Sequence, residues 1–222
     1  MVLPKTGHIP RATIQRLAVY LEVLEKLHHE GVSVISSESL AKACAVNASQ
    51  IRKDLAFFGE FGVRGVGYNA ANLMFSIATA LSTNRPWNCV LVGVGKLGHA
   101  LLNHHDFSLR SYHIVGAFDC DEERIGNVIA GITVQNVHCL KECTQELAAK
   151  IGIITTPPAW AQQVAEQLVD AGIRGILNFV PARIFVPDHV FVEYVDFFHH
   201  LYALSFNISM WEAEGKTKAI SP

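Results

Sequence analysis

The sequence has few charged residues, no long hydrophobic run and no dense set of cysteines. Charged side chains make up 17% of its 222 residues and hydrophobic ones 50%, which is the composition of a chain with a packed core. No apolar stretch reaches the roughly 18 residues that a membrane-spanning helix needs. The first ten residues hold no secretory apolar segment. We therefore expect a cytoplasmic protein without a membrane span.

The sequence also gives little support for a metal site or for covalent catalysis. Its five cysteines are an odd number without a regular framework, so we expect reduced thiols. Cys139 and Cys143 do not have the usual spacing of zinc ligands, and adjacent histidines project in different directions on a helix. Neither a Gly-x-Ser-x-Gly elbow nor a P-loop is present. No metal ligand and no catalytic residue is predicted.

The charge is distributed unevenly along the chain. Residues 1–86 carry nine Lys/Arg and six Asp/Glu, a balance of +3, whereas residues 87–222 carry nine and fourteen, a balance of −5; together they give the overall −2. A basic first part is consistent with a polyanionic partner for that part alone. A polar segment that ends in Pro86 marks a boundary. We expect domains at 1–86 and 87–203, with a terminal helical segment at 204–222.

The sequence of residues 1–86 predicts a helix-turn-helix. Apolar residues recur at helical spacing over residues 12–30. Ser36 or Ser37 can cap a second short helix, and Asn47 can cap a third after a three-residue break. Asn69 can cap a fourth. Two short helices joined by a tight turn are typical of DNA-binding proteins.

The third helix is predicted to be the recognition helix. Ile51 and Leu55 fall on one face and would pack inward, whereas Ser49, Arg52 and Lys53 point roughly the other way. Small, hydroxyl-bearing and basic side chains suit the major groove, where they can approach bases and phosphates closely.

The segment that follows this helix predicts a β-hairpin wing. Residues 59–68 contain four glycines around Arg64, which would lie at the tip and could enter a minor groove. The residues predicted to contact double-stranded DNA are Ser36, Ser37, Ser49, Gln50, Arg52, Lys53, Arg64 and Tyr68.

The second part carries a dinucleotide-binding fingerprint. A short buried strand runs into Gly93-Val94-Gly95-Lys96-Leu97-Gly98, a helix follows, and a second strand ends at Asp119. Strand, GxGxxG, helix, strand and acid in this order predict a Rossmann-type parallel sheet. The helix N-terminus would hold the pyrophosphate, and Asp119 would bind the ribose diol. An acid at this position favours NAD(H) over NADP(H).

Further α/β units extend this sheet, so the predicted fold class is α/β: a winged helix-turn-helix followed by a Rossmann domain. Strands over 151–154 and 175–179 would end at the cofactor crevice. The predicted cofactor-binding residues are Gly93, Val94, Gly95, Lys96, Leu97, Gly98, Asp119, Thr155, Thr156, Pro157, Asn178 and Phe179. An apolar helix from about Phe197 to Trp211 needs a partner within the chain or in a second subunit.

Taken together, these motifs resemble the Rex family of bacterial redox-sensing transcriptional repressors, over nearly the whole chain. The stretches that carry the resemblance are residues 51–55, 58–59, 64–68, 93–98, 175–179 and 195–197. The resemblance implies a homodimer that exchanges its C-terminal helices and represses at palindromic operators when NAD⁺ dominates. It also implies that NADH closes the dimer and withdraws the recognition helices from DNA, and that Phe197 lies near the nicotinamide pocket of the partner subunit.

One part of the family pattern is altered in this chain. In the family an aspartate exchanges between an arginine of the first helix and a tyrosine of the Rossmann domain. Asp196 matches the aspartate, but Glu22 stands at the arginine position and His104 at the tyrosine position. Glu22 would repel Asp196, whereas His104 could pair with it, and more strongly when protonated. We expect NADH control that is weakened, rewired or pH-dependent.

Three alternatives remain open at this point. The chain could be an NAD-dependent dehydrogenase with a helical appendage, although a complete wing and recognition helix would then have no use. The Rossmann domain could instead bind another nucleotide, such as coenzyme A, or none. The protein could also be a structural or corepressor protein that keeps the fold without sensing.

Overall fold

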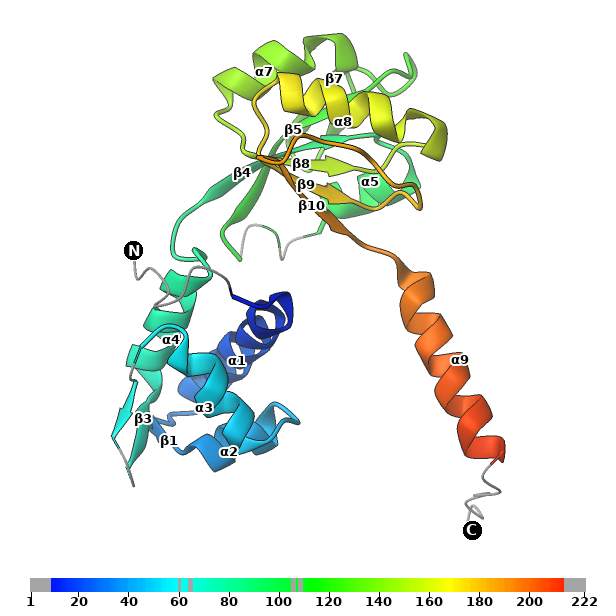
Figure 1. Cartoon of the computed structure of the whole chain (residues 1–222). Coiled ribbons are helices and arrows are strands. Elements are labelled where there is room, and N and C mark those ends of the chain that lie inside the picture. Colours follow the sequence, from blue (N-terminus) through cyan, green and yellow to red (C-terminus); the bar gives the residue numbers. More distant parts are fainter. Residues whose placement is uncertain (1–8, 60, 64–65, 105–106, 108–109, 214–222) are drawn as a thin grey trace. The chain divides into compact units, whose positions relative to one another are not determined.

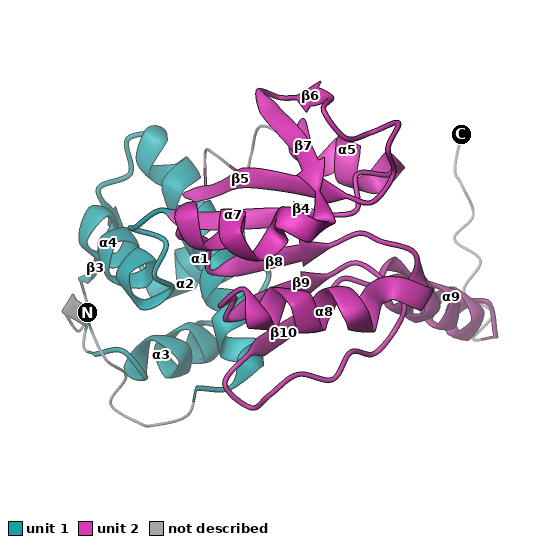
Figure 2. Cartoon of the chain, turned by 90° about the horizontal axis from the view of Figure 1, so that it is seen from above, with its two compact units in different colours: residues 1–86 teal, residues 87–222 magenta. Residues whose placement is uncertain are grey.

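The computed structural model describes residues 9–59, 61–63, 66–104, 107 and 110–213. The chain divides into two compact units, Met1–Pro86 and Trp87–Pro222, which Figure 2 colours separately. The arrangement is α/β with an N-terminal helical unit, so the predicted fold class is confirmed. Among the described helices, none is both long and apolar enough to cross a membrane.

The N-terminal unit consists of helices with a small antiparallel sheet along one side (Figure 1). Strand β3 lies between β1 and β2, so the predicted hairpin is present. The elements are α1 (Arg11–His29), β1 (Val34–Ile35), α2 (Ser37–Ala43), α3 (Ala48–Ala56), β2 (Gly62–Val63), β3 (Gly67–Asn69) and α4 (Ala70–Ala80).

Side-chain caps explain where three of these helices begin. The Ser36 hydroxyl accepts from the Ser39 amide at 3.0 Å, Asn47 Oδ1 from Gln50 at 2.8 Å, and Asn69 Oδ1 from Asn72 at 2.9 Å. Each bond satisfies an amide that a helix start leaves without an intrahelical partner. Short polar side chains in the sequence therefore set the helix starts.

A buried carboxylate joins α3, the predicted recognition helix, to α1. Asp54 is 1% exposed and accepts hydrogen bonds from Arg16 Nε at 2.7 Å, Arg16 Nη2 at 2.7 Å and the Tyr20 hydroxyl at 2.8 Å. Thr13 and Gln50 donate to it as well. Burial opposes ionisation of Asp54, but these donors outweigh it and hold its pKa below the usual aspartate value. Its stabilising contribution is therefore complete at neutral pH and is lost as the pH falls below the ordinary aspartate range.

The second unit is a doubly wound sheet with strand order β10-β9-β8-β4-β5-β7-β6. All pairs are parallel except the β6–β7 hairpin. The elements are β4 (Trp87–Val92), α5 (Lys96–Leu102), β5 (Tyr112–Asp119), β6 (Val128–Ile129), β7 (Ile132–Asn136), η1 (Val137–Cys139), α7 (Leu140–Glu146), β8 (Ile151–Ile154), η2 (Pro158–Trp160), α8 (Ala161–Asp170), β9 (Gly175–Asn178), β10 (Phe191–Tyr194) and α9 (Phe197–Ala213).

Helices cover both faces of this sheet, and the central strand shows why. Val90 and Val92 share a core cluster with residues of α7 and α8, whereas Cys89 and Leu91 share one with Leu102 of α5. Alternate side chains of a strand point to opposite faces. A central strand that is apolar on both faces therefore requires a helix layer on each side.

Helix α9 differs from the other helices because none of its described residues is buried within the chain. It begins at Phe197, where the sequence placed the start of this apolar helix. Its exposed large side chains are Phe197, Phe198, Leu201, Tyr202, Leu204, Phe206, Ile208, Met210 and Trp211. An apolar surface of this kind is typical of a protein–protein contact.

Replacing Asp54 by alanine is expected to destabilise the N-terminal unit by about 3 kcal/mol, because the change leaves Arg16 and Tyr20 without their buried acceptor. Urea unfolding followed by far-UV circular dichroism measures the loss. Glu25→Ala, on the exposed face of the same helix α1, is the matched control and should change stability by less than about 0.5 kcal/mol. Equal effects of the two substitutions would show that the buried network is unimportant.

Candidate nucleotide pocket and DNA-recognition surface

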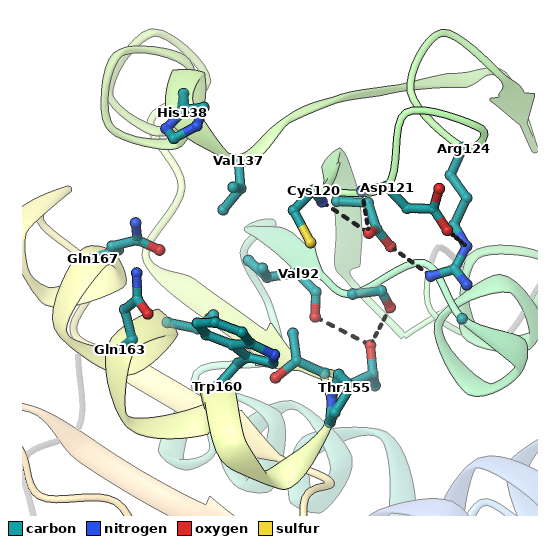
Figure 3. A pocket seen from close by; sticks show the side chains of 16 residues that line it. Val92, Cys120, Asp121, Arg124, Val137, His138, Thr155, Trp160, Gln163 and Gln167 are labelled. Carbon is teal, nitrogen blue, oxygen red and sulfur yellow. Dashed lines mark hydrogen bonds and ion pairs between the residues drawn. The ribbon is translucent and has the colours of Figure 1, made fainter.

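A cavity of about 560 Å³ lies at the carboxyl ends of the central strands of the second unit (Figure 3). Strand β4 has β5 on one side and β8 on the other, so this is the switch point at which doubly wound sheets bind ligands. The cavity is lined by Val92, Gly93, Gly95, Asp119, Cys120, Asp121, Arg124, Val137, His138, Thr155, Thr156, Pro157, Trp160, Gln163, Val164 and Gln167.

The glycine loop forms one wall of the cavity, and two of its glycines are required by close backbone contacts. Gly93 has φ +98°, and a Cβ there would lie 2.8 Å from the Thr156 amide nitrogen. A Cβ on Gly98 would collide with the Gly93 carbonyl oxygen. A Cβ on Gly95 would meet nothing within 4 Å. Since Gly95 lines the cavity, its missing side chain leaves room for a ligand group beside the start of α5.

Asp119 is tied to this loop. Its Oδ2 accepts from the Val94 amide at 2.6 Å and from Arg124 Nη1 at 3.1 Å, and its Oδ1 accepts from the amides of Cys120 and Asp121. Burial disfavours its charge, but these donors hold its pKa below the usual value. Asp119 is only 6% exposed, and its oxygens are shared between the glycine loop, the two amides that follow it and Arg124.

The residues after β8 complete the floor of the cavity. The Thr155 hydroxyl donates to the Gly93 carbonyl at 2.6 Å and so fixes the loop from below. The Thr156 hydroxyl is buried without a hydrogen-bond partner among the described residues. A buried polar atom without a partner costs free energy, and Thr156 is one of the residues that line the cavity. Open space at Gly95 and an unsatisfied hydroxyl at Thr156 fit a polar ligand such as a dinucleotide pyrophosphate.

The structure separates the predicted cofactor residues into two groups. Gly93, Gly95, Asp119, Thr155, Thr156 and Pro157 line the cavity, whereas Val94, Lys96, Leu97, Gly98, Asn178 and Phe179 do not. Val94 is buried, and Phe179 packs against the core cluster that contains Leu91 and Leu102. Asn178 is fully buried and its side chain closes the following turn through Ala182 and Val180. Such residues would support the site without bordering it.

Several cavity residues were not predicted from the sequence. Cys120, Asp121 and Arg124 follow the end of β5 and could have been found, because chain that leaves a parallel strand at its carboxyl end borders the crevice. Val137 and His138 follow strand β7, whose residues 132–135 alternate apolar and polar side chains after Gly131, so they could have been found as well. Trp160, Gln163, Val164 and Gln167 come from η2 and α8.

The recognition helix presents the predicted face to solvent. Ser49, Arg52 and Lys53 are exposed, and Ile51 and Leu55 are buried. Arg52 Nη1 lies 3.0 Å from the Ser37 hydroxyl and 3.3 Å from Glu38 Oε1, which ties α3 to α2 at the surface.

Other residues predicted to contact DNA have structural contacts. Ser36 caps α2, and Gln50 Nε2 donates to Asp54 at 3.0 Å. Tyr68 is 8% exposed and belongs to the core of the first unit, which argues against a DNA contact by its ring. Arg64 lies outside the described residues.

The residues aligned with the family switch lie on separate elements. Glu22 is exposed on α1. His104 follows α5 and meets Phe107 edge to face at 6.2 Å between ring centroids. Asp196 accepts from the Phe198 amide at 2.9 Å, and its Oδ2 lies 3.7 Å from His199 Nε2. Phe197 is 61% exposed at the start of α9.

A recognition helix with a basic exposed face and a Rossmann cavity at the switch point define a DNA-binding protein with a nucleotide-binding domain. Residues 8–56 match the family described as putative DNA-binding protein N-terminus, and residues 84–182 match the CoA binding domain family. The chain is 59% identical to the redox-sensing transcriptional repressor Rex of Maridesulfovibrio salexigens over 94% of this chain and 100% of that protein. It belongs to the Rex family of redox-sensing transcriptional repressors.

Solved structures of a Rex-family repressor called RSP agree with this assignment. RSP in complex with β-NAD⁺ and operator DNA is 34% identical, with a TM-score of 0.89 over 98% of this chain and 100% of that chain. RSP in complex with β-NADH is 33% identical, with a TM-score of 0.86 over 96% and 100%.

Gly98→Ala and Gly95→Ala should separate folding from binding. The first should destabilise the second unit by about 3 kcal/mol, because its Cβ collides with backbone and not with a movable side chain. The second should leave stability within about 0.5 kcal/mol and lower nucleotide affinity at least about tenfold, because its methyl group fills the space left for a phosphate. Urea unfolding followed by tryptophan fluorescence, and calorimetric titration with NADH, measure the two effects. An unchanged midpoint for Gly98→Ala would refute the packing argument.

Proposed function

We propose that this protein is a transcriptional repressor that binds operator DNA when NAD⁺ dominates and releases it when NADH rises. The observation that carries this proposal is the presence, in one chain, of an exposed basic recognition helix and a dinucleotide-sized cavity with a glycine loop. The related repressor RSP has been crystallised with β-NADH and with β-NAD⁺ and operator DNA together. A bacterial repressor of this kind works in the cytoplasm.

The dinucleotide would enter through the residues that line the cavity. Its pyrophosphate would lie over Gly95 at the start of α5, and the Thr156 hydroxyl would supply a polar contact. Asp119 would act mainly by holding the glycine loop in its binding conformation. For NADH to release DNA, it must bind the non-repressing state more tightly than the repressing one, and DNA must weaken NADH binding by the same factor.

The active form would be a homodimer built through α9. No described residue of α9 is buried in its own chain, and its large apolar side chains are exposed. Burial of these side chains against a second copy, with exchange of the helix between subunits, would cover them. Two recognition helices related by a two-fold axis would then match a palindromic operator. Sedimentation velocity of the full chain should show a dimer at micromolar concentration.

Two alternatives concern the second unit. A dehydrogenase would need a proton-transfer residue beside the nicotinamide, and we propose that no residue has this role. The CoA binding domain match leaves coenzyme A as a competing ligand. Turnover of 2-hydroxy acids, aldehydes or alcohols, or tighter binding of coenzyme A than of NADH, would favour these alternatives.

The central test measures binding to a palindromic operator fragment at fixed salt, with NAD⁺ and then with NADH. We expect NADH to weaken binding at least about tenfold, which corresponds to about 1.4 kcal/mol of coupling. Repeating the titration between about pH 6 and 8 tests whether His104 takes part; a flat response excludes that role. Equal binding with both nucleotides would indicate a repressor without the redox switch, and no binding would refute the DNA-binding assignment.

If Lys53 contacts a phosphate, Lys53→Ala should weaken operator binding several-fold at roughly 0.1 M salt. It should also reduce the slope of log affinity against log salt concentration by about one. Lys53 is exposed on the outer face of α3. Lys26→Ala, an exposed change of the same charge near the end of α1, is the matched control. Fluorescence anisotropy at several salt concentrations makes the comparison. Identical effects of both substitutions would point to general electrostatic attraction and not to a contact by α3.

A further inference from the structure

The adenosine end of the cavity carries an arginine that the fingerprint does not predict. Arg124 lines the cavity together with Asp119 and Asp121. In Rossmann proteins the ribose of the adenosine lies beside the acid that ends the second strand, where a nearby arginine accommodates a 2′-phosphate and so favours NADP(H). Asp119 by itself therefore does not explain a preference for NAD(H).

A second carboxylate holds this arginine. Arg124 Nη1 lies 3.1 Å from Asp119 Oδ2, and Arg124 Nε lies 3.2 Å from Asp121 Oδ2 (Figure 3). The two acids and one arginine carry a combined charge of −1. Two of the five N–H groups of the guanidinium face these carboxylates, so an incoming phosphate would meet a cation whose charge is already balanced.

Asp119 cannot readily give up its share of these contacts. Its two oxygens accept three backbone amides as well as Arg124, and it is 6% exposed. Asp121 is different, because its side chain is 36% exposed and Arg124 is 44% exposed. Its Oδ1 accepts from the Glu123 amide at 3.0 Å, while its Oδ2 faces Arg124. The charge of Arg124 is therefore balanced by two carboxylates. Asp119 is held in place by backbone amides, whereas Asp121 is partly exposed and can move.

We propose that Asp121, by holding Arg124, determines that the cavity takes a dinucleotide with a free ribose 2′-hydroxyl and rejects one with a 2′-phosphate. Asp121 acts as a specificity residue through Arg124, and Asp119 acts as the positioning residue of the loop. The inference rests on the proposed function, since it assumes that the cavity binds the adenosine half of a nicotinamide dinucleotide.

Asp121→Asn tests this directly. Asparagine keeps an oxygen for the Glu123 amide, so the local turn is retained, but it removes the charge that pairs with Arg124. Calorimetric titration of the full-length dimer with NADH and with NADPH gives the ratio of the two dissociation constants. We expect the preference for NADH to fall about five- to tenfold, mainly through tighter NADPH binding, as suits a partly exposed charge pair.

Two further variants make the result specific. Glu122→Gln removes an exposed acid of the same segment that does not line the cavity, and it should leave the ratio unchanged. Asp121→Asn combined with Arg124→Gln should lose the gain in NADPH binding, because the cation that receives the phosphate is gone.

The outcomes distinguish the inference from the proposed function. If the unmodified protein binds no NADH, the proposed function fails, and this inference with it. If the unmodified protein binds NADH but Asp121→Asn leaves the ratio unchanged, or if the double variant keeps the full gain, the inference alone is overturned.

Discussion

The contact between Gly98 and the Gly93 carbonyl is the constraint on which the nucleotide site depends. Any side chain at Gly98 would collide with that backbone oxygen, so only glycine allows α5 to start against the end of β4. This approach places Gly95 at the cavity with space where a Cβ would stand. Asp119 and Thr155 hold the loop from two sides, through the Val94 amide and the Gly93 carbonyl. Close backbone packing and two side-chain bonds thus preorganise the site before any ligand binds.

In the N-terminal unit, the buried carboxylate of Asp54 holds helix α3 in position against α1. The recognition helix α3 is short, and short helices have little intrinsic stability. Its orientation depends on the apolar face of Ile51 and Leu55 and on Asp54, which reaches Arg16 and Tyr20 of α1. A buried ion pair is weak support for stability but imposes a defined geometry when all its partners are present. Asp54 therefore sets the position of α3, the predicted recognition helix, from within the core of the unit.

Much of this arrangement could be predicted from the sequence because its determinants are local. Ser36, Asn47 and Asn69 cap the helices for which the sequence predicts them as caps. The glycine spacing of residues 93–98 is enough by itself to indicate the Rossmann loop. The less local features were missed. Helix α7 is short, and strand β7 was missed although its residues 132–135 alternate apolar and polar side chains. The partners of Asp54 lie far away in sequence, so the sequence does not indicate that they are in contact. The Asp121–Arg124 pair can be related to ligand binding only from the three-dimensional position of the cavity.

The two ends of the dinucleotide must contribute differently to sensing. NAD⁺ and NADH are identical at the adenosine ribose, so the proposed contacts with Asp119, Asp121 and Arg124 would strengthen or weaken the binding of both nucleotides by the same amount. A contact that contributes equally to the binding of two ligands cannot make the protein respond differently to them. Contacts at the adenosine end can therefore select NAD(H) over NADP(H). Discrimination between NAD⁺ and NADH must come from contacts at the nicotinamide end. If Glu22 and His104 stand where the resemblance implies the family's arginine and tyrosine, the proposed coupling from that end to the recognition helices would use groups other than an arginine–aspartate pair.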